Sequence, residues 1–232
     1  DTVRQGFGAV NNSHFDSVVP FYRQDKLGGY DYDPERAGQI LDEIGIKDTD
    51  GDGFRDLNGQ PWEINLLTFQ QGFRNYFDYA TVVQAYWQDI GIKVNLETRD
   101  LATMVEQLYQ ERKEDKPFDV MTSGWSQFGP EPNSYANQYI TTAELGPNLS
   151  NYNNPEVNDL FAQAQKMTNF DERMAVYEQI EAMLWDELPV LPLYRNTNPV
   201  VISNRFNIED AILDLSISTG FQRPERIYQV SQ

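Results

Sequence analysis

Apolar residues recur at helical spacing in five stretches of the chain, and these predict helices over residues 34–44, 74–90, 101–112, 155–167 and 171–187. The first has a clear start, because Asp33 is a favoured N-cap and Pro34 suits the first helical position. Gly45 and Gly91 follow the first two helices and are expected to end them. Asn154 is expected to cap the helix that begins at residue 155.

Between these helices, extended segments are predicted at 62–69, 92–97, 118–122, 189–194 and 200–203. Residues 92–97 alternate between apolar and polar, which is typical of a half-buried strand. Because strands and helices alternate between residues 62 and 122, the pattern predicts an α/β layer with some parallel pairing. Residues 1–32 show no sustained period and are expected to be irregular.

The chain has 232 residues, and its 40% of hydrophobic and 23% of charged residues are typical of a globular protein with one large or two small domains. Acidic residues outnumber basic ones 36 to 18, so the net charge of −18 argues against binding to nucleic acid or to an anionic membrane surface. No apolar run approaches the roughly 18 residues of a membrane-spanning helix. Because the chain does not begin with Met, we expect Asp1 to be a processed or truncated start.

The chain has no cysteine, which excludes cysteine nucleophiles and disulfides. It has one histidine, which excludes metal sites built from several histidines. We expect that histidine, His14, to lie at the surface. Three tryptophans, Trp62, Trp87 and Trp185, sit at periodic positions and are expected to pack in the core.

Short motifs follow one another in a characteristic order. They are Tyr-Asp-Pro-Glu-Arg-Ala at 32–37, an Asp- and Gly-rich loop at 48–56, Ile-Gly-Ile-Lys-Val at 90–94, Phe-Asp-Val and Gly-Trp within 118–125, Tyr-Asn-Asn-Pro-Glu-Val at 152–157 and Leu-Pro-Leu-Tyr at 191–194. In this order they resemble the C-terminal lobe of family 5 extracellular solute-binding proteins, the oligopeptide and dipeptide type that serve ABC importers.

The resemblance implies an α/β fold, a periplasmic-binding-protein-like (type II) lobe with a mixed sheet flanked by helices. It implies that residues 1–32 connect to a missing lobe, that residues 33–204 form the ligand-binding lobe, and that residues 205–232 return partly toward the other lobe. The implied function is that of the substrate-binding component of an ABC importer, which captures an oligopeptide-like solute by hinge closure and catalyses no reaction.

The implied partners are a small-molecule or oligopeptide solute and the permease subunits of the importer. We expect a monomer that does not span the membrane and that works in the periplasm or another extracytoplasmic compartment.

The segment 124–133 follows a predicted strand, and ligands of open α/β sheets lie beyond the carboxyl ends of the strands. Here Trp125 and Phe128 can stack on a ligand, and the glycines let the backbone come close. Other ligand contacts are expected from residues beside these two and from residues elsewhere in the chain. They are Ser126, Gln127, Tyr152 and Arg74. For Arg74 a surface ion pair is the alternative to clamping a carboxylate.

The resemblance also bears on the ligand. Peptide-binding members of the family have an Asp three residues after this Trp, which pairs with the amino group of the peptide, and here that position is Phe128. Thr122 stands where an Arg is common in the oligopeptide type. The aromatic pair of Trp125 and Phe128 therefore suits a flatter or less charged ligand, such as a sugar oligomer or a larger peptide-like compound.

Acidic residues in the loop at 48–56 match part of a calcium-binding pattern. The matching positions 1, 3, 5 and 9 are Asp48, Asp50, Asp52 and Asp56. Gly53 takes position 6, but Gly59 stands at position 12, where an EF-hand needs a bidentate Glu. The loop is therefore either a calcium site or a polar turn between a helix and a strand, and no other cofactor is expected.

Two other functions stay open at this point. A secreted acidic glycoside hydrolase would use a pair of carboxylates roughly 5–10 Å apart in a cleft. A calcium-stabilised adhesion or interaction module would be built around the acidic loop.

Overall fold

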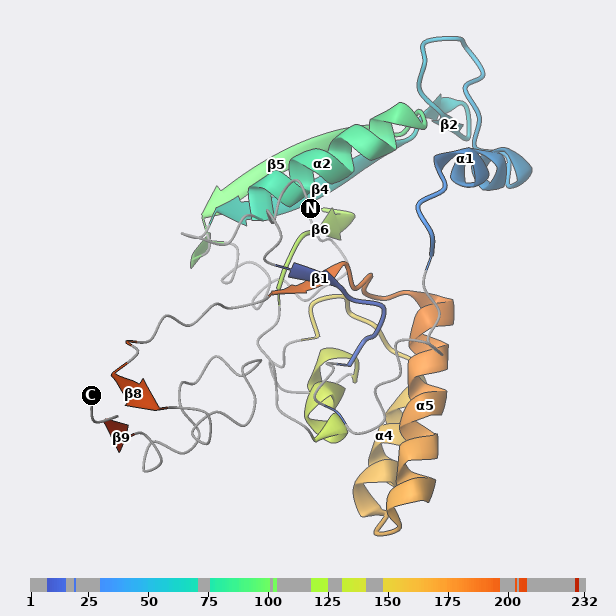
Figure 1. Cartoon of the computed structure of the whole chain (residues 1–232). Coiled ribbons are helices and arrows are strands. Elements are labelled where there is room, and N and C mark those ends of the chain that lie inside the picture. Colours follow the sequence, from blue (N-terminus) through green and yellow to red (C-terminus); the bar gives the residue numbers. More distant parts are fainter. Residues whose placement is uncertain are drawn as a thin grey trace. The chain divides into compact units, whose positions relative to one another are not determined.

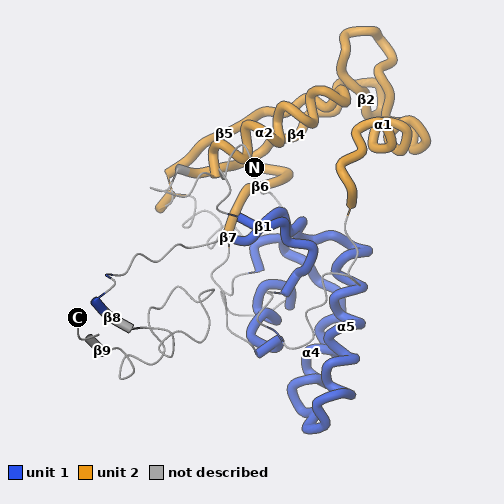
Figure 2. The backbone as a smooth tube through the Cα atoms, in the orientation of Figure 1, with its two compact units in different colours: residues 1–29, 125–232 blue, residues 30–124 orange. Residues whose placement is uncertain are grey.

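The structure is a computed structural model, and it describes residues 8–15, 19, 30–70, 76–100, 102–103, 118–124, 131–140, 148–196, 203, 205–207 and 228–229. The chain divides into two compact units: unit 1 comprises Asp1–Gly29 and Trp125–Gln232, and unit 2 comprises Tyr30–Gly124 (Figure 2). The two units are distinguished by contacts among residues of this chain, whereas the domain boundaries expected from the sequence concern a second lobe outside it. The expected boundaries at residues 32 and 204 therefore stay predictions.

Unit 2 is built around a three-stranded sheet with the order β5-β4-β6, in which both strand pairs are parallel (Figure 1). Its elements are α1 (Pro34–Glu43), β2 (Asp56–Leu57), β3 (Gln60–Pro61), β4 (Glu63–Gln70), α2 (Tyr76–Asp89), β5 (Lys93–Asp100) and β6 (Val120–Met121). Helix α2 packs on β4 and β5, and the buried core between them consists of Leu66, Ala80, Ile92 and Val94. The predicted α/β layer with parallel pairing is confirmed.

Local sequence signals account for the ends of these helices. The Asp33 side chain accepts a hydrogen bond from the backbone N–H of Arg36 at 2.8 Å, as expected of an N-cap. Gly45 and Gly91 follow α1 and α2 with φ values of 89° and 84°, which glycine adopts without strain. Of the helix predicted at 101–112, the structure describes only its start, where Asp100 accepts the backbone N–H of Thr103 at 3.0 Å.

Unit 1 contains a pair of helices, α4 and α5, and a cluster of buried aromatic rings. Its elements are β1 (Gly8–Val10), the 3₁₀ helix η1 (Pro132–Gln138), α4 (Pro155–Lys166), α5 (Phe170–Glu187), β7 (Tyr194–Asn196), β8 (Phe206–Asn207) and β9 (Tyr228–Gln229). The rings of Phe15, Tyr135, Phe161 and Tyr177 meet in its core. Both helices predicted here are confirmed, and Asn154 caps α4 as expected.

The N-terminal stretch departs from the sequence prediction. Gly8–Val10 forms β1 and pairs antiparallel with β7, although three residues are too few to show a strand period. The expectation of a surface His14 is wrong: only 5% of its surface is exposed, because its ring packs edge-on against Tyr139 and Trp185. These partners lie far away in the sequence, so the pattern around His14 carries no sign of them.

Two further expectations can be compared with the structure. The segment expected to be extended at 189–194 forms a strand only from Tyr194, because Pro189 and Pro192 have no N–H to donate to a ladder. Trp185 is buried, and Trp62 and Trp87 pack half-buried against the core of unit 2, so the expected core role of the three tryptophans is confirmed. Residues 200–202 lie outside the described part of the chain.

Antiparallel pairing within the described residues occurs in three separate two-stranded ladders, β1 with β7, β2 with β3, and β8 with β9, and in an isolated bridge between Lys47 and Asp56. The described strands thus include both parallel and antiparallel pairs, but the three-stranded sheet of unit 2 contains parallel pairs alone. None of the helices described by the structure is both long enough and apolar enough to cross a lipid bilayer.

Candidate functional site

The carboxyl ends of β4 and β6 lie side by side in unit 2. The parallel register pairs Leu66 with Val120 and Leu67 with Met121. Just beyond it, the Thr122 hydroxyl donates to the Thr68 hydroxyl at 2.7 Å. The chain therefore leaves β4 and β6 from adjacent points of the sheet. After β4 it continues to α2 and then to β5, which lies on the side of β4 opposite to β6. Such a reversal of strand order is where open α/β sheets bind their ligands.

Aromatic packing fixes the geometry of this edge, the β4–β6 edge, formed by residues 68–70 and 122–124. The rings of Phe69 and Tyr76 lie 4.5 Å apart, and both side chains are buried. Gly124 comes so close to this pair that a methyl group on it would lie 2.9 Å from Cζ of Tyr76 and closer still to its hydroxyl. Gly124 therefore lets the backbone pass close to the hydroxyl end of the Tyr76 side chain.

Most of the predicted ligand residues lie outside the described part of the chain. These are Arg74, Trp125, Ser126, Gln127 and Phe128. Their ligand contacts stay predictions, but the strands that precede them are described. The pairing of β4 with β6 places the starting points of these two segments on adjacent strands.

Tyr152, the other predicted ligand residue, lies in unit 1. It is half-buried and packs against the aromatic core of that unit. Burial, together with the nearby Glu187 carboxylate, raises the pKa of its hydroxyl to about 12. Glu187 in turn accepts a hydrogen bond from the Asn154 side chain at 2.6 Å. The contacts of Tyr152 show a packing role, and its ligand contact stays a prediction.

The acidic loop brings together only part of its predicted metal ligands. Carboxylate oxygens of Asp48, Asp50 and Asp56 lie within 4.8 Å of one another, whereas Asp52 is not in this group. Asp48 accepts the backbone N–H groups of Gly51 and Gly53 at 2.7 and 3.0 Å, so the loop also satisfies its own carboxylates.

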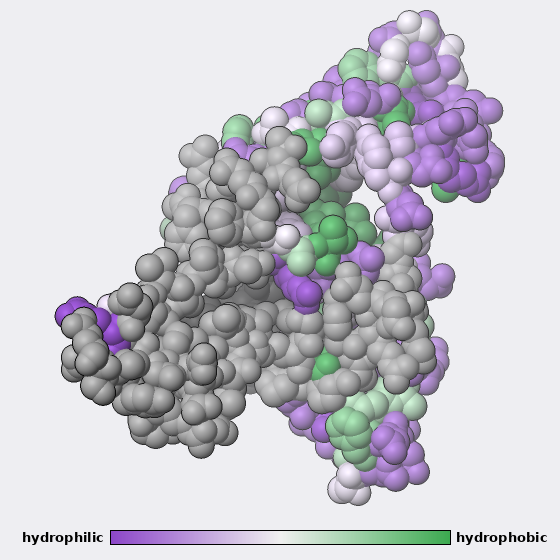
Figure 3. Space-filling view, viewed as in Figure 1, coloured by the Kyte–Doolittle hydropathy of each residue, from purple (hydrophilic) through white to green (hydrophobic). Residues whose placement is uncertain are grey.

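In the space-filling view, the end of unit 2 that carries α1 and β2 is predominantly hydrophilic (Figure 3). The oxygen-rich geometry is compatible with calcium, and calcium binding stays a prediction.

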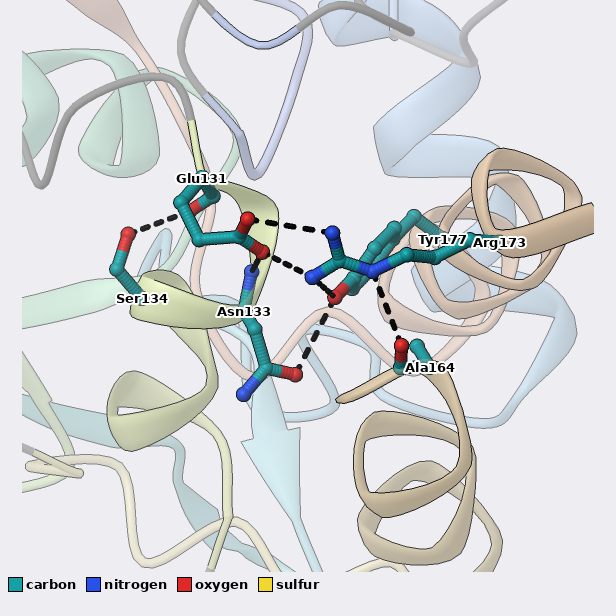
Figure 4. A network of polar contacts seen from close by, with 6 residues as sticks. All are labelled: Glu131, Asn133, Ser134, Ala164, Arg173 and Tyr177. Atoms are coloured by element: carbon teal, nitrogen blue, oxygen red, sulfur yellow. Dashed lines mark hydrogen bonds and ion pairs between the residues drawn. The ribbon is translucent and has the colours of Figure 1, made fainter. Parts of the chain in front are cut away.

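A network that the sequence did not predict surrounds Arg173 in unit 1 (Figure 4). Its guanidinium forms a bidentate ion pair with Glu131, and its Nε donates to the Ala164 carbonyl oxygen at 2.9 Å. It also donates to the Tyr177 hydroxyl at 3.1 Å, and that hydroxyl donates to Asn133 at 3.3 Å. Arg173, in the first turn of α5, thus connects the last turn of α4 with the start of η1.

A second group that sequence reasoning missed is the fully buried Glu181 on α5. One carboxylate oxygen accepts the backbone N–H of His14 at 2.9 Å and the Trp185 indole N–H at 3.1 Å. Burial raises the pKa of Glu181 to about 7 and lowers that of His14 to about 3. Spacing could have indicated its burial, since Glu181 falls on the apolar helical face between Tyr177 and Leu184.

Within the described residues, the β4–β6 edge thus exposes Ser123 and Gly124 above a buried pair of aromatic rings. The sequence model for "Bacterial extracellular solute-binding proteins, family 5 Middle" matches residues 1–146. The oligopeptide-binding protein AppA of Bacillus subtilis is 31% identical over 169 residues, 73% of this chain and 30% of AppA. Heme-binding protein A of Haemophilus influenzae is 26% identical over 88% of this chain and 35% of its own length.

The structure of B. subtilis AppA in complex with a nonapeptide has a TM-score of 0.73 and 25% identity, covering 99% of this chain and 44% of AppA. This agreement confirms the periplasmic-binding-protein-like (type II) fold. The chain spans about a third of the length of the curated relatives it matches. None of these matches supports the glycoside hydrolase alternative. The chain belongs to the bacterial extracellular solute-binding proteins of family 5.

Proposed function

We propose that this chain forms a ligand-binding lobe in the substrate-binding component of an ABC importer. The complete protein captures an oligopeptide-like solute between two lobes by hinge closure and delivers it to the membrane permease. It works outside the cytoplasm, in the periplasm or an equivalent compartment, and releases the solute chemically unchanged. Family membership supports the class of function.

The observation that carries the proposal is the parallel register of β4 and β6. It gives the segments containing Arg74 and Trp125 adjacent starting points at one edge of the sheet. That edge is where α/β folds hold ligands, and the described side chains there include buried aromatic rings and hydroxyl groups.

The proposal is tested with the full-length protein. A thermal-shift screen against oligopeptides and oligosaccharides is expected to find a stabilising solute, because a ligand that binds only the native state raises Tm. X-ray scattering is expected to show a smaller radius of gyration with that solute, and mass spectrometry is expected to recover the solute intact. A solute that is cleaved, or that binds without any closure, would contradict the proposed role.

A further inference from the structure

The N-terminal segment of residues 8–14 is attached at both of its ends to the rest of unit 1. At its start, β1 pairs antiparallel with β7, and the backbone N–H of Asn11 donates to the carbonyl oxygen of the residue before β7 at 3.3 Å. At its end, the backbone N–H of His14 donates to the carboxyl group of Glu181 at 2.9 Å. The next residue, Phe15, is fully buried in the aromatic core. The segment therefore lies between a short antiparallel ladder and a firmly packed ring.

The carboxyl group of Glu181 has the hydrogen bonds expected of a neutral acid. Its Oε1 accepts the backbone N–H of His14 and the indole N–H of Trp185, at 2.9 and 3.1 Å. Its Oε2 is buried and, among the described residues, has no hydrogen-bond partner. In a neutral carboxyl group one oxygen accepts hydrogen bonds and the other carries the proton. An ionised group would instead bury a charged oxygen without a partner, which is strongly unfavourable.

The titratable groups that face Glu181 do not supply a compensating positive charge. They are His14 from the N-terminal segment and Tyr139 from the end of η1, whose Nδ1 and hydroxyl group are hydrogen-bonded at 3.1 Å. Burial lowers the pKa of His14 to about 3 and raises that of Tyr139, so both side chains are neutral near pH 7. The hydrogen bonds and ion pairs of the described residues bring no Lys or Arg to Glu181.

Burial also sets the proton affinity of Glu181 itself. It raises the pKa of this carboxyl group to about 7, and hydrogen bonds from His14, Ser13 and Trp185 lower it by less. A Glu side chain in water has a pKa of 4.5. The closed segment therefore holds a proton on Glu181 that the same group would release if water reached it.

Loss of this proton would leave an unpaired charge in the core of unit 1. Water can reach the charge when the segment that contacts it moves away. Short ladders with few buried side chains open more easily than a packed core, and β1 has three residues, of which Val10 is 65% exposed. Phe15 packs against the rings of Tyr135 and Tyr177, so the opening is expected to stop there.

We propose that residues 8–14 form a proton-dependent latch, which stays closed on unit 1 while Glu181 carries a proton and opens when that proton is lost to water. The latch does not depend on the proposed function, because all of its groups belong to unit 1 and none is a predicted ligand residue. Residues 1–32 are predicted to connect this lobe with a second one, so an open latch would loosen that connection above about pH 7.

Hydrogen–deuterium exchange of the full-length protein, measured by mass spectrometry, reports the opening of the segment. Peptides from residues 8–14 and from α4 are compared at pH 6 and pH 8 after correction for the intrinsic exchange rate. We expect the segment to have a larger opening constant than α4 at both pH values. Because Glu181 titrates at about 7 when closed and at 4.5 in water, the opening constant should rise about tenfold from pH 6 to pH 8.

Two variants remove the titration, and a third is the control. Glu181→Gln keeps an acceptor oxygen for His14 and is expected to have the same opening constant at both pH values. Glu181→Met lacks this oxygen and is expected to open more at both, again without a pH dependence. Glu178→Gln changes an exposed residue of the same helix and should keep the tenfold rise.

Three results would overturn the latch. The first is a wild-type opening constant that is the same at pH 6 and pH 8. The second is an opening constant of the segment equal to that of α4, since the segment would then open only when the whole unit unfolds. The third is a tenfold rise that persists in Glu181→Gln or Glu181→Met, whichever of the two folds.

Discussion

Replacement of Gly124 by alanine tests the geometry of the β4–β6 edge. The new methyl group would lie 2.9 Å from Cζ and 3.1 Å from Cε1 of Tyr76, which is too close for carbon atoms. The ring of Tyr76 cannot move away freely, because it is buried and packs at a tilt against Phe69, with the ring centroids 4.5 Å apart. The substitution therefore forces the ring or the backbone after β6 to shift.

Overpacking of this kind costs about 1–3 kcal/mol of unfolding free energy. Because the shift occurs at the proposed ligand edge, we expect Gly124→Ala also to weaken solute binding. Urea unfolding followed by far-UV circular dichroism gives the change in free energy, and calorimetry gives the change in affinity. Ser123→Ala is the matched control for the unfolding measurement, since Ser123 is exposed and its truncation introduces no overlap.

A double-mutant cycle shows whether the effect arises from Tyr76. Tyr76→Phe removes the hydroxyl, the atom nearest to the new methyl group, and leaves Cζ as the closest atom. The double variant is expected to be more stable than the sum of the two single effects predicts, by about 1 kcal/mol. Additive effects, or a Gly124→Ala protein as stable as the wild type, would refute the close approach.

Three other perturbations have defined outcomes. Burial raises the pKa of Glu181 from 4.5 to about 7. Between these pH values the native state therefore keeps a proton on Glu181 that the unfolded chain releases. The free energy of unfolding of the wild type falls as pH rises through this range. Glutamine does not titrate, so the free energy of unfolding of Glu181→Gln, relative to that of the wild type, should rise by on the order of 3 kcal/mol from pH 5 to pH 8 in urea titrations. The same difference between variant and wild type at both pH values would contradict this. Arg173→Met should lower Tm more than Glu131→Gln does, because it also removes the hydrogen bonds that Arg173 donates to the Ala164 carbonyl oxygen and to the Tyr177 hydroxyl; equal losses would argue against the wider network. If the acidic loop binds calcium, millimolar calcium should raise Tm in the wild type and not in Asp48→Asn, whereas equal shifts would leave the loop a polar turn.

Local signals in the sequence were sufficient for most of the elements. Asp33 and Asn154 each stand one residue before a proline and cap a helix as predicted, because capping depends on a few neighbouring atoms. Alternation of strands and helices also predicted the parallel sheet of unit 2. The order β5-β4-β6 could not be obtained in this way, since pairing between β4 and β6 joins residues more than fifty positions apart, such as Leu66 and Val120.

The missed features depend on such distant contacts. The neighbours of His14 in the sequence have no apolar period and so predict a surface position, whereas the rings of Tyr139 and Trp185 pack against its side chain. Glu131 and Arg173 are ordinary charged residues in the sequence, and only folding brings them together. The candidate site was predicted in part: its segments were identified from the strands before them, whereas the close approach of Gly124 to Tyr76 required the structure.

A crystal structure of the full-length protein bound to its solute would locate the ligand site directly. We expect solute atoms within van der Waals distance of Ser123 and Gly124, beyond the carboxyl ends of β4 and β6, with a second lobe closed over them. A solute bound away from these strand ends would show that this edge of the parallel sheet is not the ligand site.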